Sequence, residues 1–123
     1  NEFMISQFGA GPIEHYLVRA IKEAKGGLPL SLLVLIACVF VPVSEELLYR
    51  GFVYNIFKRN FRRLSLAIII TALVFIVLHI NPVWFPSLFL ISIGLTILYE
   101  YTGSLIGPIF AHSVINSMVF IVK

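Results

Sequence analysis

A few polar side chains capable of acid–base chemistry interrupt long apolar stretches of this sequence. Two adjacent acids and an arginine close the first stretch, a histidine closes the second, and a histidine and an asparagine lie four residues apart in the last. Removing a charged group from water is costly, so ionisable groups within apolar helices normally face one another. We therefore expect six residues to converge: Glu45, Glu46, Arg50, His79, His112 and Asn116.

Helical spacing separates the two acids. Glu46 precedes Arg50 by one turn, the favourable order for an ion pair within a helix, so we expect this pair to be structural. Glu45 lies about 100° around the helix from Glu46, and no arginine follows it at that spacing. Glu45 is therefore the better candidate for a general base. Phe75, one turn before His79, is expected to pack beside the site.

The set is suited to hydrolysis by a directly activated water. Glu45 and His79 can hold and deprotonate a water, and His112 with Asn116 can donate hydrogen bonds to the oxyanion that forms when this water attacks a carbonyl. A covalent nucleophile is less favoured, because no serine or cysteine on these faces has an obvious base beside it.

Zinc binding is the nearest alternative chemistry. Glu45, His79 and His112 form a legitimate zinc-ligand set. The short His-Glu-x-x-His spacing of zinc proteases is absent, and the three ligands would come from separate helices. We therefore prefer a site without metal or other cofactor and retain zinc as the alternative.

Composition indicates a membrane protein. The chain has 123 residues, of which 59% are hydrophobic and 12% charged, and its mean hydropathy is +0.99. Soluble domains carry about 25% charged residues. At about 20 residues per span, the length predicts an all-α bundle of about four transmembrane helices. The net charge of +3 is small and unevenly placed, which argues for membrane topology rather than nucleic-acid binding.

The chain divides into two predicted segments. Residues 1–27 contain an apolar stripe at helical spacing opposite charged residues, which predicts an amphipathic helix at the membrane surface. Residues 28–123 form the predicted transmembrane core. The basic loop 58–63 should be cytoplasmic by the positive-inside rule, and we expect the plasma or inner membrane of a prokaryote. The predicted spans are Leu28–Phe57, Leu64–Ile80, Ser87–Tyr101 and Phe110–Val122.

The expected heights of the polar residues along their helices place some of them at the same depth in the membrane. Counted from the basic loop, Glu45 and His79 lie at about 20 and 24 Å on neighbouring antiparallel helices. His112 fits less well, because it is near the start of the fourth span. Pro42, one turn before Glu45, should deprive the Cys38 carbonyl of its donor and kink the helix.

The same residues carry a family resemblance. Glu45-Glu46-x-x-x-Arg50, Phe75-x-x-x-His79 and His112-x-x-x-Asn116 resemble, in order, the three motifs of the CPBP family. This family comprises the type II CAAX prenyl proteases and the bacteriocin-processing or immunity proteins, also called the Abi family. The resemblance covers roughly residues 28–123.

The resemblance implies an intramembrane endopeptidase of the glutamate type that processes a peptide or a prenylated protein. It implies that Glu45 is the general base, that His79 binds the attacking water, and that His112 and Asn116 form the oxyanion hole. Glu46 and Arg50 would be structural. Family members typically have further helices before the first motif, so neither the exact substrate nor the oligomeric state follows from the resemblance.

Two other functional classes stay open at the sequence level. A non-catalytic membrane protein, such as a bacteriocin-immunity factor, could use the same scaffold for binding. A proton- or ion-coupled transporter could use a buried Glu–His relay, although such proteins normally have more spans or an internal repeat.

Overall fold

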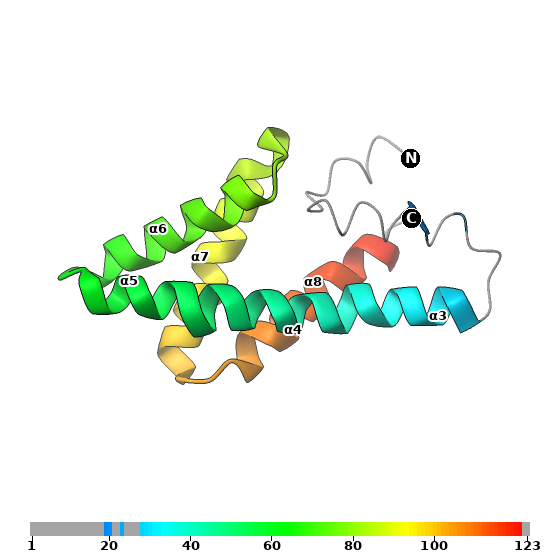
Figure 1. Ribbon diagram of the computed structural model, residues 1–123, viewed down its shortest axis with the longest axis horizontal. Coiled ribbons are helices and arrows are strands. Elements are labelled where there is room, and N and C mark those ends of the chain that lie inside the picture. The colour runs from blue at the N-terminus through cyan, green and yellow to red at the C-terminus, as the bar shows by residue number, and fades with distance from the viewer. Residues whose placement is uncertain (1–18, 21–22, 24–27, 122–123) are drawn as a thin grey trace.

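A computed structural model describes residues 19–20, 23 and 28–121, and all regular elements in these ranges are helices. Residues 28–60 form a long continuous helix with five parts: α3 (Leu28–Leu35), η1 (Ile36–Phe40), α4 (Val41–Glu46), η2 (Leu47–Val53) and α5 (Tyr54–Asn60). It is followed by α6 (Leu64–Leu78), the 3-10 turn η3 (Pro82–Trp84), α7 (Phe85–Thr102) and α8 (Ile106–Ile121). Figure 1 shows the long helix running the length of the molecule, with the other helices arranged along it.

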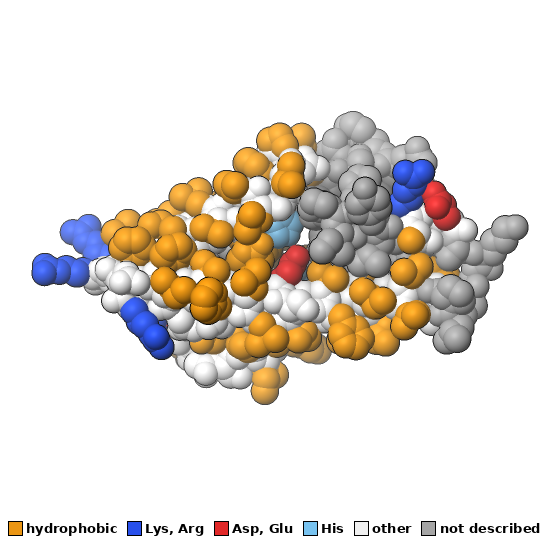
Figure 2. All heavy atoms as spheres, viewed as in Figure 1, with side chains coloured by type: hydrophobic (Ala, Val, Ile, Leu, Met, Phe, Trp, Pro, Cys, Tyr) orange, Lys and Arg blue, Asp and Glu red, His pale blue; other side chains and the backbone are white. Residues whose placement is uncertain are grey.

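In this bundle charged side chains are buried and many large apolar side chains are exposed, the opposite of the usual pattern in a water-soluble protein. Glu46 and Arg50 are fully buried, whereas Phe40, Leu90 and Phe110 are 57%, 68% and 71% exposed. Figure 2 shows hydrophobic side chains covering much of the visible surface of the described helices. Water would not tolerate so much exposed apolar area on a monomer, but hydrocarbon would. The side chains that need partners lie inside, as expected in a membrane.

Two helical stretches are long and apolar enough to cross a bilayer. They are Leu30–Asn60, with 31 residues, and Pro82–Thr102, with 21 residues. The intervening apolar helix, α6, has 15 residues, which is shorter than the roughly 20 residues of a perpendicular span. The described residues therefore form helices only, with two such stretches, and the count of about four spans stays a prediction.

The long helix contains two segments with π-helical hydrogen bonding, in which an N–H bonds to the carbonyl five residues earlier. At the end of η1 the N–H of Val41 donates to Ile36, and at the end of η2 the N–H of Tyr54 donates to Tyr49. A π-helical turn contains an extra residue, so it rotates the next part of the helix by up to about 100° relative to an uninterrupted α-helix. The α4 segment, which carries both glutamates, lies between these two π-helical segments.

Pro42 follows η1 directly. Because its nitrogen carries no hydrogen, Pro42 can donate neither to Cys38, as an α-helix requires, nor to Ala37, as a π-helix requires. We predicted a kink at Pro42. Figure 1 instead shows α4 continuing in line with the neighbouring parts of the long helix, and the local departure from α-helical structure is the changed hydrogen-bond register in η1.

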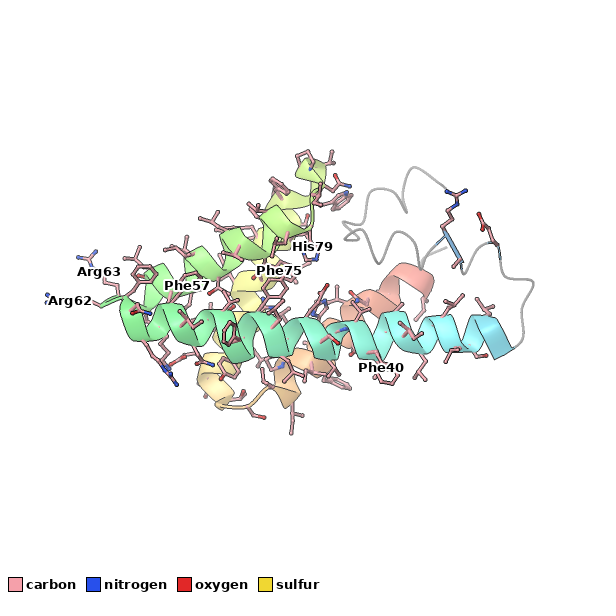
Figure 3. All side chains as sticks on the ribbon, in the orientation of Figure 1. Phe40, Phe57, Arg62, Arg63, Phe75 and His79 are labelled. Atoms are coloured by element: carbon pink, nitrogen blue, oxygen red, sulfur yellow. The ribbon has the colours of Figure 1, made fainter. Side chains whose placement is uncertain are left out.

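The connections between helices are short and have clear local causes. Figure 3 shows Arg62 and Arg63 projecting at the tip between α5 and α6, away from the other helices. Gly103 ends α7 in the left-handed conformation, with a φ of 65° that glycine adopts without strain. α8 then begins at Ile106, four residues before the start that we predicted, with Pro108 in its first turn, where proline is tolerated.

The predicted amphipathic helix within residues 1–27 lies almost wholly outside the described residues. Arg19 and Glu23 are described, and they form an exposed ion pair of 2.9 Å at a spacing of four residues. The division of the chain at residue 27 stays a prediction.

Candidate active site

The polar centre of the bundle is built on the pair that the sequence predicted as structural. Arg50 Nη1 lies 2.9 Å from Glu46 Oε1, and both side chains are fully buried. One turn of helix separates the two residues, so they need no other element to meet. The pairing removes most of the cost of burying either charge alone.

Residues of α7 complete the coordination of Arg50. Its Nη2 donates to the Ser92 carbonyl at 2.9 Å and to Ser92 Oγ at 2.8 Å, and its Nε donates to Thr96 Oγ1 at 3.2 Å. Ser92 and Thr96 are themselves fully buried and are linked by a bond from Thr96 Oγ1 to the Ser92 carbonyl. The guanidinium therefore joins the long helix to α7 through several directional bonds.

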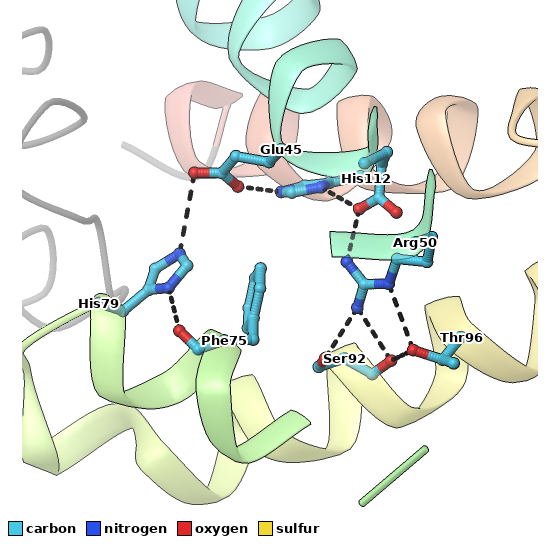
Figure 4. Close-up of polar contacts among 8 residues, drawn as sticks. Glu45, Arg50, Phe75, His79, Ser92, Thr96 and His112 are labelled. Atoms are coloured by element: carbon cyan, nitrogen blue, oxygen red, sulfur yellow. Dashed lines mark hydrogen bonds and ion pairs between the residues drawn. The ribbon is translucent and has the colours of Figure 1, made fainter. Parts of the chain in front are cut away.

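His112 links the two acids. Its Nδ1 lies 2.6 Å from Glu46 Oε1, and its Nε2 lies 3.4 Å from Glu45 Oε2. Since the carboxylate of Glu46 accepts, Nδ1 carries the hydrogen. Figure 4 shows the ring of His112 beside Glu45, and on its other side Glu46 contacts both this ring and Arg50. Glu46 therefore contacts both the structural arginine and an imidazole of the predicted catalytic set.

His79 faces Glu45 from the end of α6. Its Nδ1 donates to the Phe75 carbonyl at 2.6 Å, a bond made possible by the spacing of one turn. This bond fixes the tautomer, because the hydrogen on Nδ1 leaves Nε2 with the lone pair in the neutral ring. That Nε2 lies 4.0 Å from Glu45 Oε1. Figures 3 and 4 show the His79 ring turned from α6 toward the long helix.

Glu45 is the partly exposed member of the group. Its side chain is 21% exposed, compared with 5% for that of His79 and 6% for that of His112. Figure 2 shows an acidic and a histidine side chain side by side at the surface, next to hydrophobic side chains. The group is thus accessible from the outside of the described bundle at the acid.

Phe75 packs beneath the group, as expected from its place one turn before His79. Its ring centroid lies 4.2 Å from that of His79 and 4.9 Å from that of Tyr49. The guanidinium carbon of Arg50 lies 5.2 Å from the same ring, within cation–π range. The aromatic ring separates the His79 side of the group from the Arg50 side, as Figure 4 shows.

Asn116 makes a contact that the sequence did not suggest. Its Nδ2 donates to the backbone carbonyl of Ala37 at 3.2 Å. Ala37 is the residue in η1 whose carbonyl Pro42 cannot serve in the π-helical register. The amide of Asn116 has a second hydrogen, which leaves one donor available for other bonds.

The described residues contain no group of three or more His, Cys, Asp or Glu side chains arranged to hold a metal ion. Glu45, His79 and His112 do approach one another, and each histidine has its Nδ1 bonded to an oxygen while its Nε2 faces the acid. The proposed zinc ligands are therefore neighbours without forming a closed coordination shell.

Ser92 and Thr96, which bind Arg50, were not among the residues predicted from the sequence. Both occur in an apolar helix and are spaced by four residues, so they share a helix face. Paired hydroxyls at that spacing are the available signal, but it is a weak one because hydroxyls are common in membrane helices. The contact between Glu46 and His112 was also missed, and no local signal predicts it.

A model of a known protein family matches most of this chain. The family model described as "Type II CAAX prenyl endopeptidase Rce1-like" matches residues 27–118. Neither the curated proteins nor the solved structures contain a match to this chain. The matched range includes all of the residues in the polar centre and both helical stretches that are long enough to cross a bilayer.

Proposed function

This chain belongs to the type II CAAX prenyl endopeptidase Rce1-like family, and from that membership we propose that it is an intramembrane endopeptidase in which Glu45 activates water directly. Membership confirms the family resemblance and implies a membrane-embedded protease. The mechanism and the substrate are our proposal. The observation that carries it is the approach of two oriented imidazoles to one partly exposed acid.

The spacing between Glu45 and His79 suits a bridging water. At 4.0 Å, Glu45 Oε1 and His79 Nε2 are too far apart for a direct hydrogen bond. Both atoms accept, because the hydrogen of His79 is on Nδ1. A water that donates one hydrogen to each would turn its lone pairs outward, toward a substrate carbonyl. Glu45 would then take the proton as the water attacks, and would pass it to the amine nitrogen of the leaving peptide when the C–N bond breaks.

His112 is the proposed stabiliser of the resulting oxyanion. Its Nδ1 donates to Glu46, and a hydrogen carried on Nε2 during the reaction could be donated to the tetrahedral oxyanion. The second amide hydrogen of Asn116 is the proposed companion donor. Glu46 thus supports the reaction by holding the imidazole.

The proposed substrate is a peptide with a prenyl group or a comparably apolar segment. The family description names a prenyl endopeptidase, and the exposed side chains on the described helices are largely apolar. A lipidated peptide could therefore approach Glu45 from the bilayer without leaving an apolar environment. Cleavage would follow the prenylated cysteine and release the last three residues.

We further propose four membrane crossings, with the basic tip at residues 58–63 on the cytoplasmic side of a prokaryotic plasma or inner membrane. Exposed Arg59, Arg62 and Arg63 at this tip support that orientation. The test is accessibility of a cysteine introduced at Arg62 to a membrane-impermeant thiol reagent, in a background with Cys38 replaced. Labelling in right-side-out vesicles would contradict this orientation.

The decisive experiment is cleavage of a farnesylated peptide by the purified protein. We expect wild type to release the C-terminal tripeptide, and Glu45→Gln and His79→Ala to lose this activity while remaining folded. A wild-type protein that cleaves neither farnesylated nor unmodified peptides would favour a binding role, such as bacteriocin immunity.

Repeating the cleavage assay with a metal chelator distinguishes direct activation of water by Glu45 from a zinc-dependent mechanism. Activity that persists in excess chelator supports direct activation by Glu45. Activity that disappears with chelator and returns with added zinc would instead assign Glu45, His79 and His112 as metal ligands.

A further inference from the structure

We propose that Asn116 is a positioning residue that holds the π-helical segment η1 in its register and thereby aims Glu45 at the two histidines. The inference rests on the proposed function, because it concerns the same site. It gives Asn116 a role in addition to, and separable from, donation to an oxyanion.

The first step concerns the backbone of η1. Val41 donates to Ile36, so the Ala37 carbonyl has lost the donor that an α-helix would give it. The donor expected in a π-helix is the nitrogen of Pro42, which has no hydrogen. Ala37 is 4% exposed, so water does not replace the missing donor freely. An unpaired buried carbonyl is costly, above all in a membrane.

The second step is that Asn116 provides the missing donor. Its Nδ2 lies 3.2 Å from the Ala37 carbonyl, across 79 positions of sequence. The bond ties α8 to η1 one turn of α8 beyond His112, the residue that bridges Glu45 and Glu46. A single side chain thus stabilises the irregular backbone and fixes α8 against it.

The third step links this bond to Glu45. A return of η1 to α-helical bonding would remove one residue from a turn and rotate Glu45 by up to about 100° relative to α3. Glu45 follows Pro42 by three residues, and its distances of 3.4 and 4.0 Å to the imidazoles leave little room for such a rotation. The register of η1 therefore bears directly on the alignment of the site.

An asparagine side chain also donates to backbone carbonyls at the second π-helical segment, η2. At the end of η2, Tyr54 donates to Tyr49, and the side chain of Asn55 donates to the carbonyls of Arg50 and Gly51, each at 2.9 Å. An asparagine amide thus serves carbonyls at both irregular turns that flank the glutamates. Asn55 lies on the same helix, far from His112 in sequence, and provides a matched control.

The test is whether Pro42→Ala rescues Asn116→Ala. Replacing Pro42 with alanine restores a backbone N–H that can bond to Ala37, but it adds no donor for an oxyanion. We expect Asn116→Ala to lower kcat on the farnesylated peptide by about tenfold to 100-fold, with KM within about twofold because substrate contacts are unchanged. Addition of Pro42→Ala should recover at least about tenfold of the kcat, since it replaces the lost bond.

Two controls make the result specific. Pro42→Ala should give no recovery in an Asn55→Ala background, because that asparagine serves a different turn. Melting temperatures in detergent should rise with kcat in the rescued double variant, which links recovery to the backbone. A double variant that regains its melting temperature but none of its kcat would overturn the positioning role and assign Asn116 to the oxyanion alone. If the wild-type protein does not cleave the farnesylated peptide at all, the proposed function itself is rejected.

Discussion

Glu45 and Glu46 are adjacent in sequence but have opposite environments. Glu46 is fully buried, and its Oε1 lies 2.9 Å from Arg50 and 2.6 Å from His112. Glu45 is 21% exposed and lies 3.4 and 4.0 Å from the imidazoles of His112 and His79. One position of helix, about 100° of rotation, separates an acid that holds the bundle together from an acid that faces a possible substrate.

The difference between the two acids shows how a membrane protein can keep one carboxylate able to accept a proton. Arg50 and His112 both bind Oε1 of Glu46, and Ser92 and Thr96 bind Arg50, so the buried ion pair of Glu46 and Arg50 forms without a contact to Glu45. Glu45 can then bind water and accept a proton without weakening that ion pair. We expect identical substitutions at the two acids to have different consequences.

The largest effect is expected from Glu45→Gln. Glutamine keeps the shape of the side chain but cannot accept a proton, so turnover of the farnesylated peptide should fall by about 10²- to 10⁴-fold. The melting temperature in detergent should stay near that of wild type, because the side chain is partly exposed. A variant that keeps most of its activity would remove Glu45 from the role of general base.

Glu46→Gln should act mainly on stability. It leaves Arg50 buried without its carboxylate, and breaking a buried pair in this way costs about 3 to 5 kcal/mol. The measurement is the free energy of unfolding in detergent titrated with a denaturing surfactant, with Glu45→Gln as the matched control. Equal stability of the two variants would contradict the division of roles.

Ser92→Ala tests how far the inner network extends. Loss of Ser92 Oγ removes one bond to a charged group, which is worth about 1.5 to 3 kcal/mol, while the Ser92 carbonyl remains. Ser87→Ala on the same helix is the control, because Ser87 is exposed. Both variants are compared with wild type in the same unfolding titration. If they unfold alike, Ser92 does not support Arg50.

The smallest effect is expected at a partly exposed ion pair between the long helix and α7. Lys58 Nζ lies 2.6 Å from Glu100 Oε1, but the two side chains are 44% and 27% exposed. Lys58→Ala should therefore change the unfolding free energy by no more than about 1 kcal/mol. A loss as large as that of Glu46→Gln would show that exposure does not separate these two ion pairs.

Much of this protein could be predicted from local sequence pattern. The apolar stretches indicated helices in a membrane, and their boundaries agree closely for α6 and less well for α8, where Gly107 and Pro108 delayed the predicted start. The approach of Arg50 to Glu46 and of His79 to the Phe75 carbonyl follows from a spacing of four residues. Such contacts lie within one turn, so helical geometry alone fixes them.

The sequence by itself determined the membrane class and the family, because these depend on composition and on motifs within single helices. It also predicted five residues that the structure brings together: Glu45, Glu46, Arg50, His79 and His112. Only the tertiary structure decided that His112 bridges both acids, that Ser92 and Thr96 hold Arg50, and that Asn116 bonds to Ala37. These contacts join different helices, whose relative height and rotation depend on packing. The π-helical turns beside α4 shift that rotation further, and no periodicity in the residues reveals such a shift.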